Sequence, residues 1–492
     1  MKPENLIDAI GLLDDKIIEA AQDSRKVKKK KRGWVKFIAI AACFCIIVAG
    51  VAGHFGNIPP DNGGFDPTPP AVNFLSYKIN EAVYPETFDY PQEEQFMHLV
   101  DIDWESYSDA LDKWYERDEA RLGNRLSIDN YSSFLLSSTK NFFKGNTDNL
   151  VYSPLNVYLA LSMLAETTGS NTRSQILELL GADSIEAVRN NANKLWLSNY
   201  IDDGVTTNVL ANSVWLSEDM EYNKNTLDIL AENYYASSFR GKMGSAGYNK
   251  ALQEWLSDQT GGLLKKEASE VEFTNNTVLG LASTVYFKAR WNSEFNEINT
   301  EPDTFNGKDG KQTIDFMNQT SSNDYYYDDN YSAVAMNFTN LSSKMWLILP
   351  DEGTTPEKLI ADGDIDPILT GGKPANVKSY SLVRLSMPKF DVSSSLDLRK
   401  NLRQLGVTDV FDDAKADFSP TFSSSAYVSM MQHSARVTVD EEGCTAAAFT
   451  VITEDSSAAP ENIIDFKLDR PFIFVITADN STPLFVGIVN NV

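Results

Sequence analysis

The pattern of hydrophobic and polar positions divides the chain into a short front segment and a long mixed body. Over residues 4–22 hydrophobic side chains recur every three or four positions, which predicts a short amphipathic helix. Residues 34–53 are apolar apart from Lys36, and a helix of about 20 residues spans the ~30 Å hydrocarbon core of a bilayer. The pattern predicts a transmembrane anchor at residues 34–53.

Basic residues flank this apolar stretch on its N-terminal side, with seven of them in residues 25–32. Basic flanks stay in the cytoplasm, so residues 1–33 are predicted to be cytoplasmic and the C-terminal domain to lie outside. The predicted localisation is the cell membrane, with a single pass. Two alternatives stay open: a signal peptide cleaved within residues 49–52, and a lipoprotein box at residues 40–43.

Beyond the apolar stretch, residues 54–71 are rich in Pro and Gly and are predicted to be a linker. Residues 72–492 are predicted to form one large domain, whose core begins at residue 119. Residues 72–118 are acidic and aromatic, and the sequence assigns them no role beyond packing on the domain that follows.

Within the large domain, helical patterns dominate before about residue 270 and strand patterns after it. Residues 156–164 are hydrophobic on almost every face, which predicts a buried helix beginning behind the cap Ser153 and Pro154. Runs rich in β-branched and aromatic residues predict strands. They lie at 284–287, 345–349, 437–439 and 472–476. This order predicts an α+β fold with a large sheet covered by helices.

Charge and cysteine content narrow the class of protein. The chain has 492 residues and a net charge of -26. Residues 1–53 hold ten basic and six acidic residues, so residues 54–492 hold the other 33 basic and 63 acidic ones, a balance of -30. An acidic body without a basic stripe argues against a nucleic-acid partner. Cys43 and Cys45 lie in the apolar stretch, so Cys444 alone remains in the domain and no disulfide framework is possible there.

The sequence offers little for enzyme chemistry. Its histidines are His54, His98 and His433, and it contains no nucleophile elbow, phosphate-binding loop or Cys/His metal spacing. We predict that the protein is not an enzyme and has no catalytic residues, no cofactor and no metal site.

Residues 440–470 carry the most informative pattern. A strand-like run ends at Gly443, and residues 444–448 are all small. Residues 449–453 are β-prone, and residues 454–462 are polar and turn-like. Small side chains can enter between two paired strands without prising them apart, and the entering segment gains backbone hydrogen bonds on both sides. Strand alternation would bury Cys444, Ala446, Ala448, Thr450 and Ile452 and turn Thr445, Ala447 and Phe449 outward.

This stretch resembles the hinge of the serpin family, whose usual form is Glu-Glu-Gly-Thr/Ser-Glu-Ala-Ala-Ala. Further segments resemble serpin motifs in the same order along some 370 residues, which makes the series specific. They are residues 149–154 (NLVYSP), 285–291 (VYFKARW), 349–353 (LPDEG), 387–390 (MPKF), 405–407 (LGV), 469–472 (DRPF) and 483–487 (PLFVG).

The resemblance implies a serpin fold: a large central mixed β-sheet, additional sheets, a helical N-terminal half and an exposed reactive loop near the C-terminus. It implies an extracytoplasmic serine-protease inhibitor that acts as a suicide substrate, trapping an acyl-enzyme by inserting its cleaved loop into the central sheet. The implied hinge comprises Glu441, Glu442, Gly443, Cys444, Thr445, Ala446, Ala447 and Ala448. Family spacing puts the reactive bond between Ser457 and Ala458, with a register that can shift by two or three residues.

The loop composition narrows the predicted partner. No Lys or Arg lies between Arg436 and Lys467, which disfavours a trypsin-like protease. The small residues at 456–459 favour an elastase- or subtilisin-like protease, and Glu454 or Asp455 would suit an acid-preferring one. The alternative function is a non-inhibitory serpin that serves as a binding or scaffold protein. The small residues at hinge positions 444, 446 and 448 favour inhibition.

Five residues match positions where the family controls opening of its sheet: Ser153, Asn156, Ser283, Trp291 and His433. His433 resembles a buried histidine of that region and is not expected to be catalytic. Asn156 stands where the family usually has serine, and Ser283 where it has asparagine. We expect the two to exchange hydrogen-bonding groups.

Overall fold

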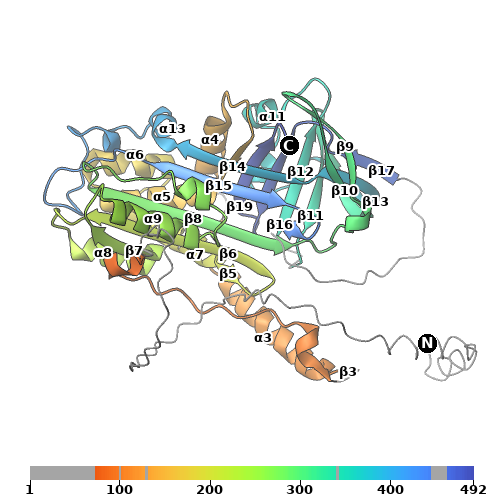
Figure 1. Ribbon diagram of the computed structural model, residues 1–492, viewed down its shortest axis with the longest axis horizontal. Helices are drawn as coiled ribbons and strands as arrows, with labels where there is room; N and C mark the ends of the chain where they lie inside the picture. The colour runs from red at the N-terminus through yellow and green to blue at the C-terminus, as the bar shows by residue number, and fades with distance from the viewer. Residues whose placement is uncertain (1–72, 99–100, 128–130, 340–342, 445–462) are drawn as a thin grey trace, which may run out of the picture. The chain divides into compact units, whose positions relative to one another are not determined.

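The computed structural model describes residues 73–492 except 99–100, 128–130, 340–342 and 445–462 (Figure 1). Backbone contacts divide the chain into two compact units, residues 1–69 and 70–492, and all described residues belong to the second. The predictions for residues 1–72, for hinge residues 445–448 and for the bond between Ser457 and Ala458 lie outside the described residues.

The predicted membrane localisation is corrected by the structure. The longest helix of the described residues, α3 (Trp104–Leu122), has 19 residues, but acidic and basic side chains recur along it. Within the described part of the chain no helix combines the length and the apolar character that a membrane span needs. The single-pass prediction was wrong on this finding, and the segment 34–53 on which it relied is not among the described residues.

Helix α5 (Pro154–Thr167) contains the predicted residues 156–164. The Ser153 hydroxyl accepts a hydrogen bond from the Asn156 N–H, and Pro154 occupies the first turn, so both local start signals operate. All of its residues are buried. The other helices are α4 (Ser132–Phe143), α6 (Ser170–Leu180), α7 (Ile185–Asn199), α8 (Lys224–Tyr234), α9 (Ala246–Asp258), α10 (Lys265–Ala268), α11 (Pro356–Asp362), α12 (Asp366–Leu369) and α13 (Leu398–Gln404).

An eight-stranded sheet, here called sheet A, has the order β1-β7-β6-β8-β16-β15-β14, with β5 paired to β6. Strands β6 and β7 are parallel and the other pairs are antiparallel, so the sheet is mixed. Its strands are β1 (Lys78–Asn80), β5 (Ile201–Asp202), β6 (Thr206–Ser217), β7 (Ala236–Gly241), β8 (Leu279–Arg290), β14 (Phe390–Asp397), β15 (Gln432–Val439) and β16 (Gly443–Cys444).

A nine-stranded sheet, here called sheet B, has the order β17-β13-β10-β11-β12-β18-β19-β4, with β9 paired to β10. Strands β12, β18 and β19 are almost wholly apolar and buried, as expected of strands covered on both faces. The strands are β4 (Leu150–Tyr152), β9 (Glu301–Gly307), β10 (Gly310–Tyr327), β11 (Tyr331–Asn337), β12 (Lys344–Pro350), β13 (Asn376–Pro388), β17 (Ile463–Lys467), β18 (Phe472–Thr477) and β19 (Pro483–Val489).

The two faces of sheet A are covered by different helices. Helix α5 packs on one face, where the Asn156 amide donates to the Ser283 carbonyl of β8. Helix α9 packs on the other, with Trp255 meeting Trp215 of β6 edge-to-face at 6.4 Å. Figure 1 shows the long strands β8, β15 and β14 side by side and sheet B at the end where β16 lies. The predicted α+β fold, with a large mixed sheet covered by helices, is confirmed.

The described part of residues 72–118, for which no role was predicted beyond packing on the domain that follows, does pack on this body. Strand β1 extends the edge of sheet A through pairing with β7, and Tyr77 contacts Tyr248 of α9 at 5.0 Å between ring centroids. A small two-stranded sheet, β2 (Met97–His98) and β3 (Asp101–Ile102), precedes helix α3. Near its C-terminal end, Arg121 pairs with Asp118 and with Asp479, which holds α3 against the body.

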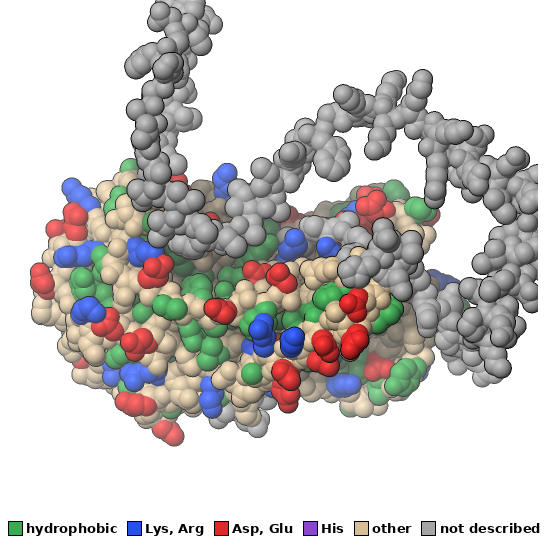
Figure 2. All heavy atoms as spheres, turned by 90° about the horizontal axis from the view of Figure 1, so that it is seen from below, with side chains coloured by type: hydrophobic (Ala, Val, Ile, Leu, Met, Phe, Trp, Pro, Cys, Tyr) green, Lys and Arg blue, Asp and Glu red, His purple; other side chains and the backbone are tan. Residues whose placement is uncertain are grey.

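Figure 2 shows one face of the molecule, on which basic and acidic side chains alternate with hydrophobic ones. Toward the right of this view several acidic side chains gather beside a few basic ones.

Candidate functional site

Sheet A has a gap between β8 and β15. In the described part of the chain these two strands are connected only through β16, whose two residues pair with both neighbours. Gly443 pairs with Arg290 and Cys444 with Ala289 on β8, while Cys444 also pairs with Val439 on β15. Away from Cys444, along the rest of their length, β8 and β15 share no ladder of backbone hydrogen bonds among the described residues. The sheet therefore has room for a strand that continues β16.

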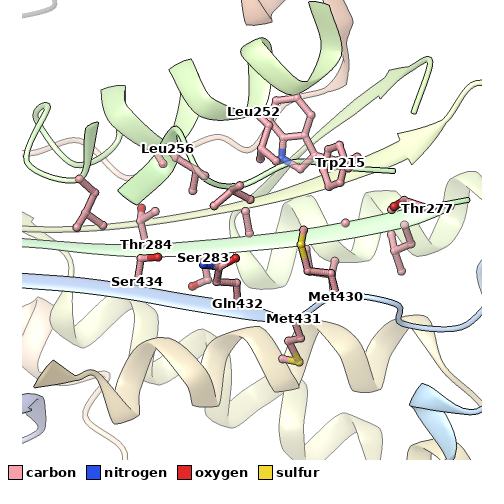
Figure 3. Close-up of a pocket in the computed structure, with 18 residues that line it drawn as sticks. Trp215, Leu252, Leu256, Thr277, Ser283, Thr284, Met430, Met431, Gln432 and Ser434 are labelled. Atoms are coloured by element: carbon pink, nitrogen blue, oxygen red, sulfur yellow. The ribbon is translucent and has the colours of Figure 1, made fainter. Parts of the chain in front are cut away.

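A narrow cavity of about 70 Å³ marks the far part of this gap. Figure 3 shows Ser283 of β8 opposite Gln432 and Ser434 of β15, with Leu252 and Leu256 of α9 closing one side. The volume corresponds to about two water molecules. It is too small for an organic ligand of ordinary size, so its significance lies in the separation of the two strands.

The turn that leads into β16 is closed by its own backbone and by one carboxylate. Asp440 Oδ1 accepts hydrogen bonds from the N–H groups of Glu442 and Gly443, at 3.1 and 3.2 Å. The Asp440 N–H donates to the Gly443 carbonyl oxygen at 3.1 Å. This arrangement reverses the chain after β15 and directs it back into the gap.

Trp291, at the end of β8, holds the same turn from the other side. Its main-chain N–H donates to the Glu442 carbonyl and its indole Nε1–H to the Asp440 carbonyl, both at 3.0 Å. Its ring stacks on Phe338 with centroids 4.8 Å apart and planes 9° apart. The nearby Phe295 N–H donates to the Glu441 carbonyl at 3.0 Å. Carbonyl groups of three consecutive turn residues are therefore fixed.

Glu441 is 5% exposed and carries the buried charge of the turn. Its Oε1 lies 2.7 Å from Lys389 Nζ and accepts a hydrogen bond from the Thr300 hydroxyl at 2.7 Å. Burial acts to raise the pKa of Glu441, but the hydrogen bonds from Lys389 and Thr300 outweigh it, and the pKa is lowered. Lys389 precedes β14, so this ion pair ties the turn to the strand beyond β15.

Gly443 and Cys444 are the two predicted hinge residues that form β16 in sheet A. A β-carbon at Gly443 would approach the Ala289 carbonyl oxygen to 2.3 Å, so the close approach of the two backbones requires glycine. The Cys444 side chain is 2% exposed. Burial, with a smaller contribution from Asp440, raises the pKa of its thiol to about 12, so the sulfur is an uncharged, small hydrophobic group.

Four of the residues predicted to control opening of the sheet lie together at the start of α5, on the face of sheet A that this helix covers. They are Ser153, Asn156, Ser283 and His433. His433 Nε2 accepts a hydrogen bond from the Ser153 N–H at 3.1 Å, and its ring contacts Tyr152 edge-to-face at 5.7 Å. Burial lowers the pKa of His433 to about 4. The Asn156 amide donates to the main-chain carbonyl of Ser283 at 2.8 Å. The partner of the Asn156 side chain is therefore the Ser283 backbone, and the buried Ser283 hydroxyl has no hydrogen-bond partner among the described residues.

The structure therefore distributes the predicted residues over two ends of one gap. Trp291 lies with Glu441, Glu442, Gly443 and Cys444 at the end that holds β16. Ser153, Asn156, Ser283 and His433 lie together at the α5 side of the sheet.

Sequence reasoning missed three groups of the hinge end: Asp440 as the turn-closing carboxylate, Thr300 and Lys389. Lys389 stands in the MPKF segment, which was noted for its resemblance, but its partner is 52 positions away. In the described residues no cluster of three or more His, Cys, Asp or Glu side chains could hold a metal ion. His433 is 3% exposed, its Nε2 accepts a main-chain N–H, and its Nδ1 is buried with no hydrogen-bond partner among the described residues.

Comparisons with known proteins agree with this geometry. Residues 129–492 match the family described as Serpin (serine protease inhibitor). The chain is 29% identical over 386 residues to Serpin-Z10 of Arabidopsis thaliana, covering 73% of this chain and 97% of that protein. It is 27% identical over 362 residues to plasminogen activator inhibitor 1 of Bos taurus, covering 69% of this chain and 86% of that protein.

Solved structures give the same result. The thermophilic serpin tengpin in its native state is similar with a TM-score of 0.67 and 30% identity, covering 74% of this chain and 94% of tengpin. The latent state of tengpin gives a TM-score of 0.62 at 27% identity, with 74% and 97% of the two chains covered.

Proposed function

Because the chain belongs to the serpin family, we propose that it inhibits a serine protease as a suicide substrate. The protease serine Oγ attacks the Ser457 carbonyl carbon. An ester forms between Ser457 and the protease, the Ser457–Ala458 peptide bond breaks, and the Ala458 amine leaves with a proton. The segment after Gly443 then continues β16 into the gap of sheet A and carries the acylated protease with it.

The single observation that carries this proposal is the gap itself. Gly443 and Cys444 both pair with β8, and Cys444 also pairs with β15 on the other side. An entering strand would gain backbone hydrogen bonds to two strands at once, which supplies a free-energy gain without any outside energy source. Cleavage is needed because an intact loop is tied at its far end to β17, which begins at Ile463.

The side chains that would enter suit the gap. In strand alternation the neighbours of Cys444 on the buried face are Ala446 and Ala448, both small and apolar. Cys444 itself is accepted there as a buried, neutral group. A charged side chain at Ala446 or Ala448 would have to be desolvated at a cost of several kcal/mol.

The target proposed from the loop is a protease that prefers small side chains, of the elastase or subtilisin type. The specificity pocket of a trypsin-like protease contains a carboxylate that binds a Lys or Arg of the substrate. No Lys or Arg lies between Arg436 and Lys467, so that carboxylate would stay unpaired. A protease that prefers Glu or Asp is the second choice, served by Glu454 or Asp455.

The experiment incubates the full chain with an elastase, a subtilisin and a Glu-specific protease, and resolves the products on denaturing gels. The proposal expects an SDS-stable complex and a released fragment that begins at or within three residues of Ala458. Turnover of the chain by every protease without a complex would contradict inhibition and favour the binding or scaffold function. A complex with the Glu-specific protease alone would move the reactive bond to Glu454 or Asp455.

A further inference from the structure

Tyr380 adopts a backbone conformation that bulky residues rarely take. Its φ is +51°, in the left-handed region, where any residue other than glycine is strained. Three other non-glycine residues in the described part of the chain share such a φ. Tyr235 gains a stack on Trp196, with centroids 3.8 Å apart, and the Ser170 hydroxyl donates to Asp417 at 2.5 Å. Tyr380 is instead 86% exposed.

The backbone strain at Tyr380 arises where β10 and β13 pair as a two-stranded antiparallel ribbon. Asn323 pairs with Ser381 and Tyr325 with Lys378, so two residues of β13 lie opposite Asp324 alone, which is a β-bulge. Asp324 Oδ1 accepts the Tyr380 N–H at 3.2 Å, and Oδ2 accepts the Tyr326 hydroxyl at 3.1 Å. The bulge therefore has its own polar support, and the exposed Tyr380 ring adds nothing to the core that would offset its strain.

Around Tyr380 the ribbon displays aromatic and basic groups together. Lys378 Nζ lies 5.8 Å from the Tyr325 ring centroid and 5.5 Å from that of Tyr327. Val377, Lys378 and Tyr327 are exposed. These exposed aromatic side chains surround one lysine on a chain of net charge -26. Exposed aromatic residues are typical of protein-binding surfaces. We call Tyr327, Val377, Lys378 and Tyr380 the ribbon patch.

The ribbon patch lies beside the point where the reactive loop rejoins the fold. Strand β17 runs parallel to β13 and begins with Ile463 opposite Leu382, two positions from Tyr380. Two strand residues span about 7 Å. Ile463 follows Ala458 by five positions, so the proposed bond lies at most about 18 Å along the chain from the start of β17. A protease domain of about 230 residues has a radius of gyration of about 17 Å. A protease bound at the loop therefore reaches the patch.

We propose that the ribbon patch is a secondary docking surface for the target protease, contacting an acidic area of the protease beside its active-site cleft. The inference rests on the proposed inhibitory function and adds the surface that selects among proteases able to cleave the loop. Lys378 supplies charge attraction that steers encounter, and Tyr380 supplies the rigid aromatic contact that its strained backbone holds outward.

The test measures the second-order rate constant of complex formation between the full chain and the elastase or subtilisin that gives an SDS-stable complex. The variants are Tyr380→Gly and Tyr380→Asn, which suit a positive φ, and Lys378→Gln. The control is Val83→Ala, because Val83 is 84% exposed and lies in the segment before the family match. We expect the Tyr380 variants to react about tenfold more slowly. Lys378→Gln should react about threefold more slowly and flatten the salt dependence of the rate.

Two further readouts separate docking from a structural role. The Tyr380 variants should melt at the same or a higher temperature than the unchanged protein, because the strain is relieved. Their ratio of complex to cleaved inhibitor should stay unchanged, since the loop inserts after docking. Unchanged rates in both Tyr380 variants overturn the proposal, and so does a slower rate accompanied by a lower melting temperature. A dimer of the chain that Tyr380→Gly dissociates would assign the patch to a second copy and also overturn it. Failure of the unchanged protein to form any complex would instead reject the inhibitory function.

Discussion

The backbone of Gly443 lies so close to that of Ala289 that a β-carbon on Gly443 would stand 2.3 Å from the Ala289 carbonyl oxygen. The contact occurs where the hinge enters between β8 and β15, at the pair Gly443–Arg290. A side chain at this position must push the two strands apart or push the hinge out of the gap. The position of the hinge in the sheet therefore depends on the absence of a side chain at residue 443.

The first prediction concerns this glycine. Gly443→Ala should displace β16 and slow insertion, so that more of the inhibitor is cleaved without trapping the protease. We expect the number of inhibitor molecules consumed per protease inactivated to rise several-fold. Titration of protease activity measures this number. Cys444→Ala is the matched control, since it keeps a small buried side chain one residue further on, and an equal effect in both variants would contradict the steric account.

The second prediction uses the alternation of the entering strand. Ala446→Arg should convert the inhibitor into a substrate, because an inward arginine must be buried without a partner. Ala447→Arg should retain inhibition, because alternation turns residue 447 outward. The yield of SDS-stable complex distinguishes the two variants. Equal inhibition by both would show that this segment does not enter the sheet as a strand.

The third prediction follows from the buried imidazole. Burial lowers the pKa of His433 in the folded protein to about 4, against about 6.5 when unfolded. The unfolded state therefore binds a proton first as the pH falls, so stability is full above pH 6.5 and is lost on acidification towards pH 4. The loss between pH 7 and pH 5 should be about 2 kcal/mol.

Denaturant unfolding at pH 7 and pH 5 measures this loss. His433→Gln removes the titrating group, so its stability should fall less over the same interval. The difference between the two proteins isolates His433 from the carboxylates that also titrate on acidification. A pH dependence that is the same in both proteins would show that His433 is not buried in the neutral form.

The fourth prediction concerns the ion pair between Lys389 and Glu441. Lys389→Met removes the cation while Glu441 stays buried with the Thr300 hydroxyl, which should cost about 1–2 kcal/mol because Lys389 is partly exposed. The turn loosens, and the intact protein should lose inhibitory activity on storage about tenfold faster. Arg384→Met, which breaks the exposed pair with Asp465, is the control and should have little effect. Equal half-lives of the two variants would contradict a role for this pair in holding the hinge.

The sequence predicted features whose signals are local. Ser153 and Pro154 mark the start of α5 because a cap and a first-turn proline act within a few residues. The β-branched runs at 284–287, 345–349, 437–439 and 472–476 lie in β8, β12, β15 and β18. The order of the motifs was sufficient for the family and the fold.

Contacts between distant positions could not be predicted in this way. The Trp291 indole donates to a carbonyl 149 positions away, and Arg121 pairs with Asp479, 358 positions away. Backbone carbonyls and surface carboxylates carry no sequence signal that identifies such partners. How many residues after Gly443 pair with the sheet also depends on distant contacts. The turn closed by Asp440 and the backbone hydrogen bonds to β8 and β15 act on it together.

The central claim is that the chain after Gly443 can become a strand between β8 and β15 once the loop is cut. The most direct measurement cleaves the loop near Ser457 with a protease that does not stay bound, and compares the melting temperatures of cut and intact protein. A large rise in melting temperature is predicted, because the cut strand fills the gap in sheet A. A cut protein that melts at or below the temperature of the intact one would contradict the account.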